Sequence, residues 1–304
     1  MFPLTKSLQQ NNIMKKFLLL LLLSTFVHYT NAQDTSLLKD IEETLPVSEK
    51  VTGAFKSTRV INAHSVEMLS KGNLDFRILH RFGFVSDGVK QLFGLDAASM
   101  RMSFDYGITD NLTVGVGRST FRKELDAFVK TRLLQQTKGA KEIPFSVVVA
   151  AGYTVHTQED FSGKKPSLAD RSAYYVQLVA GRKFNSKFSM QLSPIFVHTN
   201  VPFITTDDRK IFAMGGGARY KVSKRTALTL DYHHPFGKLA DNYTNPLSIG
   251  VDIETGGHVF QLHFSNATGM NERAYITQTT GNFFKGDMRL GFNLSRMFKV
   301  GKKR

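Results

Sequence analysis

The stretch DMRLGFNLSRMF, residues 287–298, alternates between apolar and polar side chains. The alternating pairs along it run Met288/Arg289, Leu290/Gly291, Phe292/Asn293 and Leu294/Ser295. Because successive side chains of a strand point to opposite faces, this pattern predicts a strand with one apolar face and one polar, small face. At ~3.3 Å per residue and a tilt of about 45°, it would span roughly 28 Å, close to the hydrocarbon thickness of a bilayer. The stretch therefore predicts a membrane-crossing strand.

The same alternation recurs along the chain from residue 74 onward. In the segments that begin at residues 74, 100, 112, 145, 212, 228 and 260, almost every second side chain is apolar. The alternation is less regular in residues 125–136, 171–184 and 187–199. We therefore expect an all-β fold, a transmembrane antiparallel up-and-down β-barrel of about 12 strands over residues 74–298. An aromatic residue at the end of the last strand, here Phe298, is typical of the C-terminal strand of such barrels.

The predicted connections alternate between short and long. Short polar turns are expected at residues 109–110, 137–142, 185–186, 223–224 and 254–256. Long links are expected at residues 83–96, 157–170, 200–208, 235–245 and 266–285, with a shorter one at 122–124. Outer-membrane barrels place short turns on the periplasmic side and long loops outside the cell. The pattern predicts that both ends of the barrel lie in the periplasm.

A soluble periplasmic β-sandwich or calycin-like barrel is the main alternative, since soluble sheets also alternate. The predicted strands are longer than the five or six residues usual in soluble sheets. Their polar parity is rich in Gly, Ser and Thr, which suits a crowded lumen, and Tyr and Phe recur near strand ends as an interfacial girdle requires. These features favour the membrane barrel.

The N-terminal residues 1–32 have the pattern of a signal peptide with an upstream extension. Lys15 and Lys16 precede the leucine run 18–23, and small residues lead to a predicted cleavage between Ala32 and Gln33. Export predicts location in the bacterial outer membrane. It also makes nucleic acid an unsuitable partner, although 40 Lys and Arg against 25 Asp and Glu give a formal charge of +15. The chain has no cysteine, which excludes disulfides and thiolate sites.

Two segments flank the predicted barrel. Residues 33–73 are expected to form a periplasmic lead-in that tucks into the barrel mouth, with a short amphipathic helix at 36–45. Residues 55–62 could form a strand. The barrel would then have thirteen strands, whereas bacterial outer-membrane barrels usually have an even number. We therefore expect them outside the barrel wall. Residues 299–304 form a basic C-terminal tail.

The polar parity of the strands collects charged residues that would face the lumen. The predicted lumen-lining residues are Arg77, Arg81, Arg101, Asp105, Arg219, Lys221, Asp231 and Arg289. With Lys130, Arg132 and Lys183 added, nine inward cations would face three inward acids, Asp75, Asp105 and Asp231. Charges inside a barrel tune which solutes pass, so we expect a small pore or transport channel with a basic lumen and a small anionic solute. The alternative is a plugged structural or adhesive barrel.

The sequence offers little sign of catalysis. His263 and Ser265 share a strand face, and the order His-x-Ser-Asn at 263–266 superficially resembles that of outer-membrane phospholipases, which makes a barrel hydrolase a further alternative. Both side chains are expected to face the lumen and the rest of that pattern is missing. The histidines are scattered, so we predict no catalytic residue, metal site or cofactor. The expected partners are outer-membrane lipid and the barrel-assembly machinery.

Several motifs carry a family resemblance. They are residues 55–67 (FKSTRVINAHSVE), 74–77 (LDFR), 80–83 (HRFG), 92–96 (LFGLD) and 106–110 (YGITD). Together they resemble an uncharacterised β-barrel family of Bacteroidetes-type bacteria, and the resemblance covers most of the mature chain. It implies an outer-membrane barrel and supplies no substrate or catalytic residue.

Overall fold

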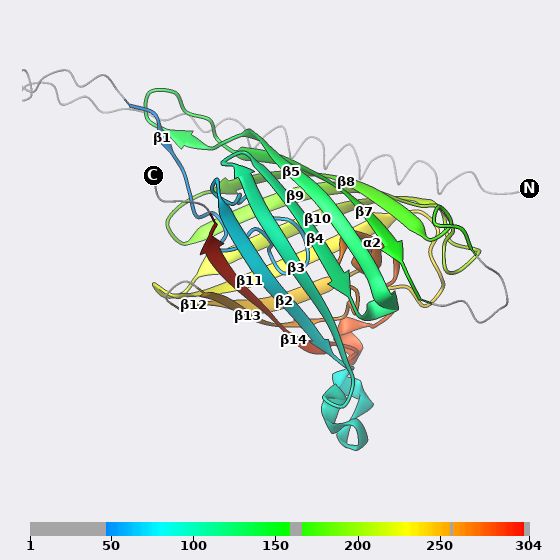
Figure 1. The fold of residues 1–304 in the computed structure, drawn as a ribbon. Helices are drawn as coiled ribbons and strands as arrows, with labels where there is room; N and C mark the ends of the chain where they lie inside the picture. The colour runs from blue at the N-terminus through cyan, green and yellow to red at the C-terminus, as the bar shows by residue number, and fades with distance from the viewer. Residues whose placement is uncertain (1–46, 159–165, 256–257, 301–304) are drawn as a thin grey trace, which may run out of the picture. The chain divides into compact units, whose positions relative to one another are not determined.

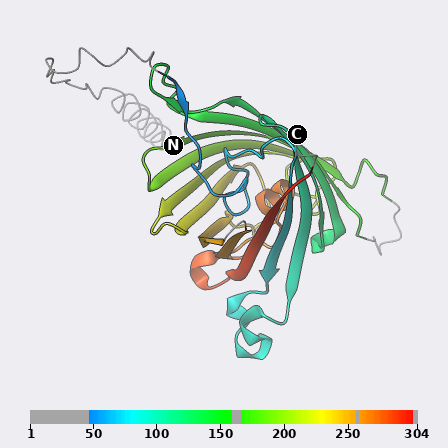
Figure 2. The same ribbon diagram turned by 60° about the vertical axis from the view of Figure 1, so that its left-hand side comes forward.

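A computed structural model describes residues 47–158, 166–255 and 258–300 of the 304-residue chain. The predicted signal peptide and the predicted helix at 36–45 lie outside these residues. The described part contains a closed antiparallel barrel of 12 strands. Figures 1 and 2 show how the strands curve around a common interior. The predicted fold class and strand number are confirmed.

The barrel strands follow one another in chain order. They are β2 (Asn73–Phe82), β3 (Ala98–Thr109), β4 (Leu112–Ser119), β5 (Glu124–Leu134), β7 (Ser146–His156), β8 (Ser172–Lys183), β9 (Phe188–Thr199), β10 (Lys210–Lys221), β11 (Thr226–Phe236), β12 (Leu247–Thr255), β13 (His258–Ser265) and β14 (Arg289–Lys299). Each strand pairs with its neighbours in sequence, and β14 pairs with β2 to close the ring. The last strand starts two residues later than the sequence predicted, because Asp287 accepts hydrogen bonds from the loop residues Ser86 and Asn282.

Short and long connections alternate around the barrel as predicted, except that the connection between β5 and β7, residues 135–145, is longer than the predicted turn at 137–142 and carries β6. We call the end with the long connections the long-loop end and the other the turn end. The long loop between β2 and β3 carries the 3-10 helices η1 (Val85–Asp87) and η2 (Val89–Gly94), and it projects away from the barrel in Figure 1. The other 3-10 helices are η3 (Phe121–Lys123) and η4 (Phe283–Lys285). At the turn end, β1 (Glu49–Lys50) pairs with β6 (Thr137–Lys138) outside the barrel sheet.

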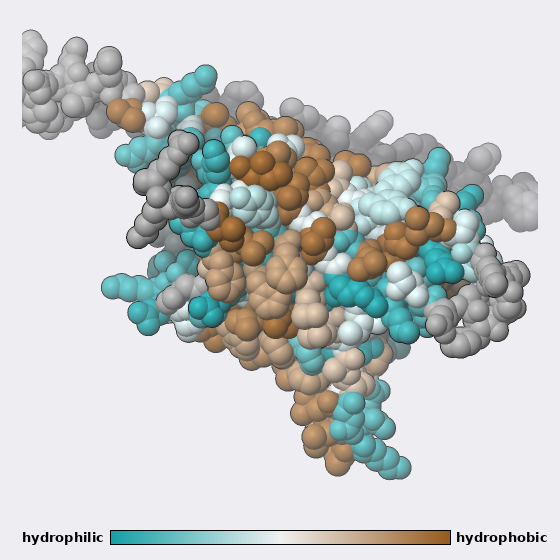
Figure 3. Space-filling model, viewed as in Figure 1, coloured by the Kyte–Doolittle hydropathy of each residue, from teal (hydrophilic) through white to brown (hydrophobic). Residues whose placement is uncertain are grey.

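The outward parity of the strands is apolar and exposed. Large exposed side chains recur in mid-strand and include Phe104, Val116, Val129, Val176, Leu192, Met214, Leu230, Ile249 and Leu262. In Figure 3 hydrophobic residues gather over the strands. Aromatic side chains on this parity lie toward strand ends, among them Tyr153, Tyr174, Phe212, Tyr220, Phe236 and Phe298. So much exposed apolar surface is unusual in a soluble monomer and fits a lipid-facing wall.

The interior of the barrel is filled by two segments from outside the wall. The first, residues 54–69, is buried along almost its whole length, and Figure 2 shows it within the ring of strands; we call it the plug. It forms no strand in the wall, as predicted; a single antiparallel bridge joins Arg59 to His64. The second segment contains the helix α2 (Glu272–Thr277) in the β13–β14 loop, and it folds inward against β8, β9 and β11.

Candidate functional site

The plug is held by inward-facing polar side chains from strands around the ring. Lys130 donates to the carbonyls of Thr58 and Glu67 at 3.2 and 2.6 Å. Further donors to plug atoms are Arg77 and Arg81 (β2), Gln191 (β9), Gln261 (β13) and Asn293 (β14). These groups come from strands on all sides of the lumen, so the plug is fixed to the wall as a whole rather than to one strand.

The carboxylate of Asp231 binds the turn at the tip of the plug. Its Oδ2 accepts hydrogen bonds from three consecutive backbone N–H groups, those of residues 61, 62 and 63, at 3.2, 2.8 and 3.0 Å. Hydrogen bonds from backbone N–H groups to an ionised acceptor are among the stronger ones in proteins. The concave row of amides and the buried carboxylate therefore form a specific lock between β11 and the plug.

A second lock joins the plug to α2. Arg59 lies 2.7 Å from the Glu272 carboxylate and also donates to the carbonyl of Asn62 at 2.6 Å. His64 Nε2 lies 3.3 Å from Glu272 and 3.0 Å from the Tyr175 hydroxyl. Burial opposes the charge on Arg59, but the neighbouring Glu272 carboxylate raises the pKa of this guanidinium above its ordinary value. This buried ion pair thus joins the plug to the β13–β14 loop.

The buried position of His64 lowers the pKa of its imidazole well below the ordinary value. Burial disfavours the charged ring, and the cations Arg59 and Lys130 add to the effect. The neutral ring still forms a hydrogen bond with the Tyr175 hydroxyl, at 3.0 Å. His64 therefore packs beside Glu272 as an uncharged hydrogen-bonding group.

The strands of the barrel wall contain two further buried ion pairs. Arg77 Nε lies 2.7 Å from Asp75 and 3.7 Å from Asp105. Arg101 pairs with Asp126 through two hydrogen bonds of 2.9 and 2.5 Å. Charged groups this deeply buried need partners. Asp75 lies on the same strand as Arg77, Asp105 lies on the adjacent strand β3, and Asp126 reaches Arg101 from β5, two strands away.

The residues predicted to line the lumen fall into two groups. Arg77, Arg81, Arg101, Asp105 and Asp231 are buried inside the barrel. Arg219, Lys221 and Arg289 are only partly buried and lie near strand ends. All eight lie on the inward parity of their strands, and their role in solute passage stays a prediction.

The structure adds acids that the sequence reasoning did not count. Glu124, Asp126, Asp252 and Glu272 are also buried in the interior. Asp252 lies on the parity opposite to Ile249, Val251 and Ile253, a signal that the sequence did carry. The excess of positive charge in the lumen is therefore smaller than the one predicted from nine inward cations and three inward acids.

The pair considered for hydrolysis is buried as expected but is not assembled for it. His263 and Ser265 both face the interior. Ser265 Oγ accepts hydrogen bonds from the Ser248 hydroxyl at 2.8 Å and from the Ala267 N–H, and no hydrogen bond joins it to His263 within the described residues. A nucleophilic serine needs a base within hydrogen-bond reach.

No group of three or more His, Cys, Asp or Glu side chains among the described residues could hold a metal ion. No helix within the described ranges has the length and apolar character needed to cross a membrane.

A closed antiparallel barrel with an apolar outer surface and a polar interior defines a β-barrel that spans a membrane, of the kind found in the bacterial outer membrane. The chain belongs to the family DUF5777, described as a membrane bound beta barrel domain, which matches residues 55–298. The match begins within the plug, so the plug is part of the family's domain.

Solved structures with a similar barrel have low sequence identity to the chain. The NanC porin is 9% identical with a TM-score of 0.48, covering 75% of this chain and 100% of that one. An outer membrane channel from Pseudomonas putida F1 is 15% identical with a TM-score of 0.46, covering 77% and 98%. The KdgM porin is 9% identical with a TM-score of 0.44, covering 75% and 99%. No curated protein sequence matches the chain.

Proposed function

We propose that the protein is a small-solute channel of the outer membrane whose passage is closed by the plug. The observation that carries this proposal is how the lumen is filled. The wall leaves space for the plug: a Cβ at Gly217 would lie 2.9 Å from Val60, and one at Gly181 would lie 2.8 Å from Val66. A barrel with a permanently filled interior could fill this space with side chains from its own strands.

The contacts between plug and wall also support a plug that can be released. They include many hydrogen bonds and ion pairs, and water can replace these when the plug moves. The net contribution of each hydrogen bond is therefore only about 0.5–1.5 kcal/mol, or ~1.5–3 kcal/mol where a charge is involved. A plug held by apolar packing alone would expose a dry surface on release. The polar lumen left behind would suit a hydrated solute.

The proposal is tested by the conductance of purified protein in planar bilayers. We expect rare openings in the native protein, more frequent openings in Asp231→Asn, and steady conductance when residues 54–69 are replaced by a Gly-Ser linker of equal length. The Asp231→Asn change weakens the lock on the plug tip while keeping the size of the side chain. The matched control is Asp241→Asn, which removes an exposed loop carboxylate.

A plugged structural or adhesive barrel is the second candidate. It is favoured by the spread of plug contacts around the ring, from β2 through β14. A linker variant that folds, with heat-modifiable migration on a gel, and yet carries no current would support this candidate over the channel.

Several expectations remain part of the proposal. The solute is predicted to be a small anion, and outer-membrane lipid and the barrel-assembly machinery are the predicted partners. Two of the solved structures with a similar barrel are described as porins, and one as the KdgM porin in complex with disordered oligogalacturonate. Restriction to Bacteroidetes-type bacteria, the absence of enzymatic activity and the predicted domain limits also stay predictions.

A further inference from the structure

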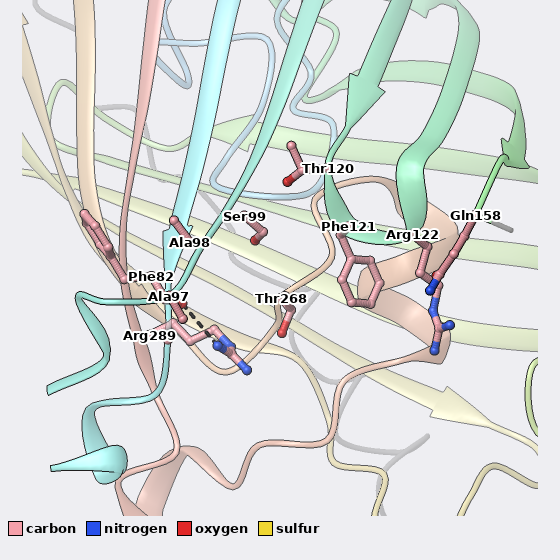
Figure 4. A pocket seen from close by; sticks show the side chains of 11 residues that line it. Phe82, Ala97, Ala98, Ser99, Thr120, Phe121, Arg122, Gln158, Thr268 and Arg289 are labelled. Carbon is pink, nitrogen blue, oxygen red and sulfur yellow. Dashed lines mark hydrogen bonds between the residues drawn. The ribbon is translucent and has the colours of Figure 1, made fainter. Parts of the chain in front are cut away.

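A cavity of about 500 Å³ opens at the long-loop end of the barrel, above the plugged interior; we call it the vestibule. Its volume lies within the range of roughly 300–1,000 Å³ that is usual for small-molecule sites. Two arginines line it, Arg122 from η3 and Arg289 from the start of β14. Figure 4 shows them at opposite sides, with Phe121 and Thr268 between them.

The two arginines are held in the same way. The guanidinium of Arg289 lies 3.6 Å from the ring centre of Phe84, and its Nη1 donates to the carbonyl of Phe82 at 3.1 Å. The guanidinium of Arg122 lies 3.7 Å from the ring centre of Phe203, and its Nε donates to Gln278 at 3.1 Å. A guanidinium stacked on a ring and held by one hydrogen bond loses little further freedom when it binds a ligand.

Neither arginine of the vestibule forms a close ion pair within the described residues, although the carboxylates of Asp87 and Asp287 are near enough to Arg289 to favour its charge. No carboxylate of the described ranges lies within 4.0 Å of either guanidinium, and no Asp or Glu lines the cavity. The Nε of Arg289 and the hydroxyl of Ser99 are buried without a hydrogen-bond partner among the described residues. Burial lowers the pKa of the Arg122 guanidinium, as expected for a cation without a paired anion. Groups of this kind are satisfied by an anion from outside the chain.

The rest of the lining fits an organic anion better than a bare inorganic one. The side chains of Phe121, Ala97 and Ala98 give the cavity an apolar surface, while Thr120, Thr268 and Gln158 add neutral hydrogen-bonding groups. We propose that the vestibule binds a small organic carboxylate, with the arginines meeting its charge and Phe121 packing against its apolar body. The inference rests on the proposed function, since it names the class of solute that the channel would admit.

Binding is measured by titration calorimetry of the full chain in detergent, where an open lumen is not needed. The probe is benzoate, with benzamide as its uncharged match and inorganic phosphate as an anion without an apolar body. We expect benzoate to bind, and Arg122→Gln or Arg289→Gln to weaken its binding by at least about tenfold, since a hydrogen bond to a charged group is lost. The control Lys285→Gln removes an exposed charge from the same end and should leave binding unchanged.

Three results would overturn the inference: no benzoate binding, equal binding of benzamide and benzoate, or binding that both arginine variants retain. Phosphate binding as tight as benzoate binding would contradict the organic class. Thermal unfolding of each variant, matched to the native protein, shows that the fold is kept. Benzoate binding in a protein whose linker variant carries no current would sink the channel proposal while leaving the vestibule site in place.

Discussion

The middle of the lumen and its mouth use the same residue types in opposite ways. In the middle, Arg59 and Arg101 each pair with a buried carboxylate, and these pairs hold segments of the chain together. At the mouth, Arg122 and Arg289 stack on aromatic rings and no carboxylate lies within 4.0 Å of them in the described ranges. The difference indicates that cations in this barrel serve two purposes. Inside the barrel cations fix structure, by pairing with carboxylates or, as Lys130 and Arg81 do, by donating to oxygen atoms of the plug. We propose that the arginines at the mouth are left for a solute.

Breaking a central pair should have the largest effect. Glu272→Ala leaves Arg59 as a buried, uncompensated charge, and we expect a loss of about 3–5 kcal/mol in the free energy that holds the plug. Amide hydrogen exchange of residues 54–69 measures this loss directly. The double variant Arg59→Met/Glu272→Met should recover much of the protection because no lone charge remains. Equal exchange in the single and double variants would show that the ion pair does not hold the plug.

A charge introduced on the lipid-facing surface should lower the free energy of unfolding by somewhat less, and it should destabilise the barrel wall without affecting the contacts of the plug. Leu230 is 41% exposed in the middle of β11, so Leu230→Arg places a charge in lipid and should destabilise the barrel by about 2–4 kcal/mol. The control Tyr220→Arg, near the turn end, should cost only ~0–1 kcal/mol. Urea unfolding in lipid vesicles measures both. Equal losses would mean that depth in a bilayer is not what distinguishes the two sites.

The plug should also loosen in acid. Because the pKa of His64 in the folded protein is lowered by burial and by Arg59 and Lys130, the unfolded chain binds its proton more readily. The contribution of His64 to stability is therefore fully present above the unfolded pKa of roughly 6.5 and is lost as the pH falls below it. The Glu272 carboxylate and the Tyr175 hydroxyl lie beside the ring, at 3.3 and 3.0 Å from Nε2. Hydrogen exchange of the plug at pH 7.5 and 5.5 should differ more in the native protein than in His64→Gln.

A further experiment tests which side of the membrane the long-loop end faces, and we expect it to have the smallest effect on stability. Protease sites inserted at Asp241, in a long loop, should be cleaved on intact cells, whereas sites at Ser186 or Lys224, in turns, should be protected. All three positions are exposed in the described structure. Cleavage of the turn sites from outside would place the vestibule on the periplasmic side and reverse its proposed role in solute entry.

The wall could be predicted from the sequence because its signal is local. A period of two fixes which side chains face lipid, and it holds through β3, β11 and β14. In β5 the signal is weaker because Phe128 faces inward among polar residues, which obscured the inward position of Asp126. The period of two predicts the strands of the wall, but it does not predict which segments fill the lumen.

The plug and the vestibule could not be predicted in the same way. Residues 54–69 have no period of their own, since their conformation depends on contacts with distant strands such as that of Asn62 with Asp231. The helix α2 is only six residues long, too short for a recognisable apolar face. Arg122 and Arg289 come together only because the loops after β4 and before β14 meet at one end of the ring.

The position of the plug across the closing seam constrains the order in which the chain can fold. Arg81 of β2 donates to Asn293 of β14 at 3.1 Å across that seam, and the same two side chains bind Asn62 and Ile61 of the plug. Two partners of Asn293, Arg81 and Ile61, thus lie more than 200 positions earlier in the chain, and the plug is made before the barrel strands during synthesis. Its complete binding site exists only once the last strand has joined the first. The docked plug is therefore a late product of assembly and a marker of a barrel that has closed in register.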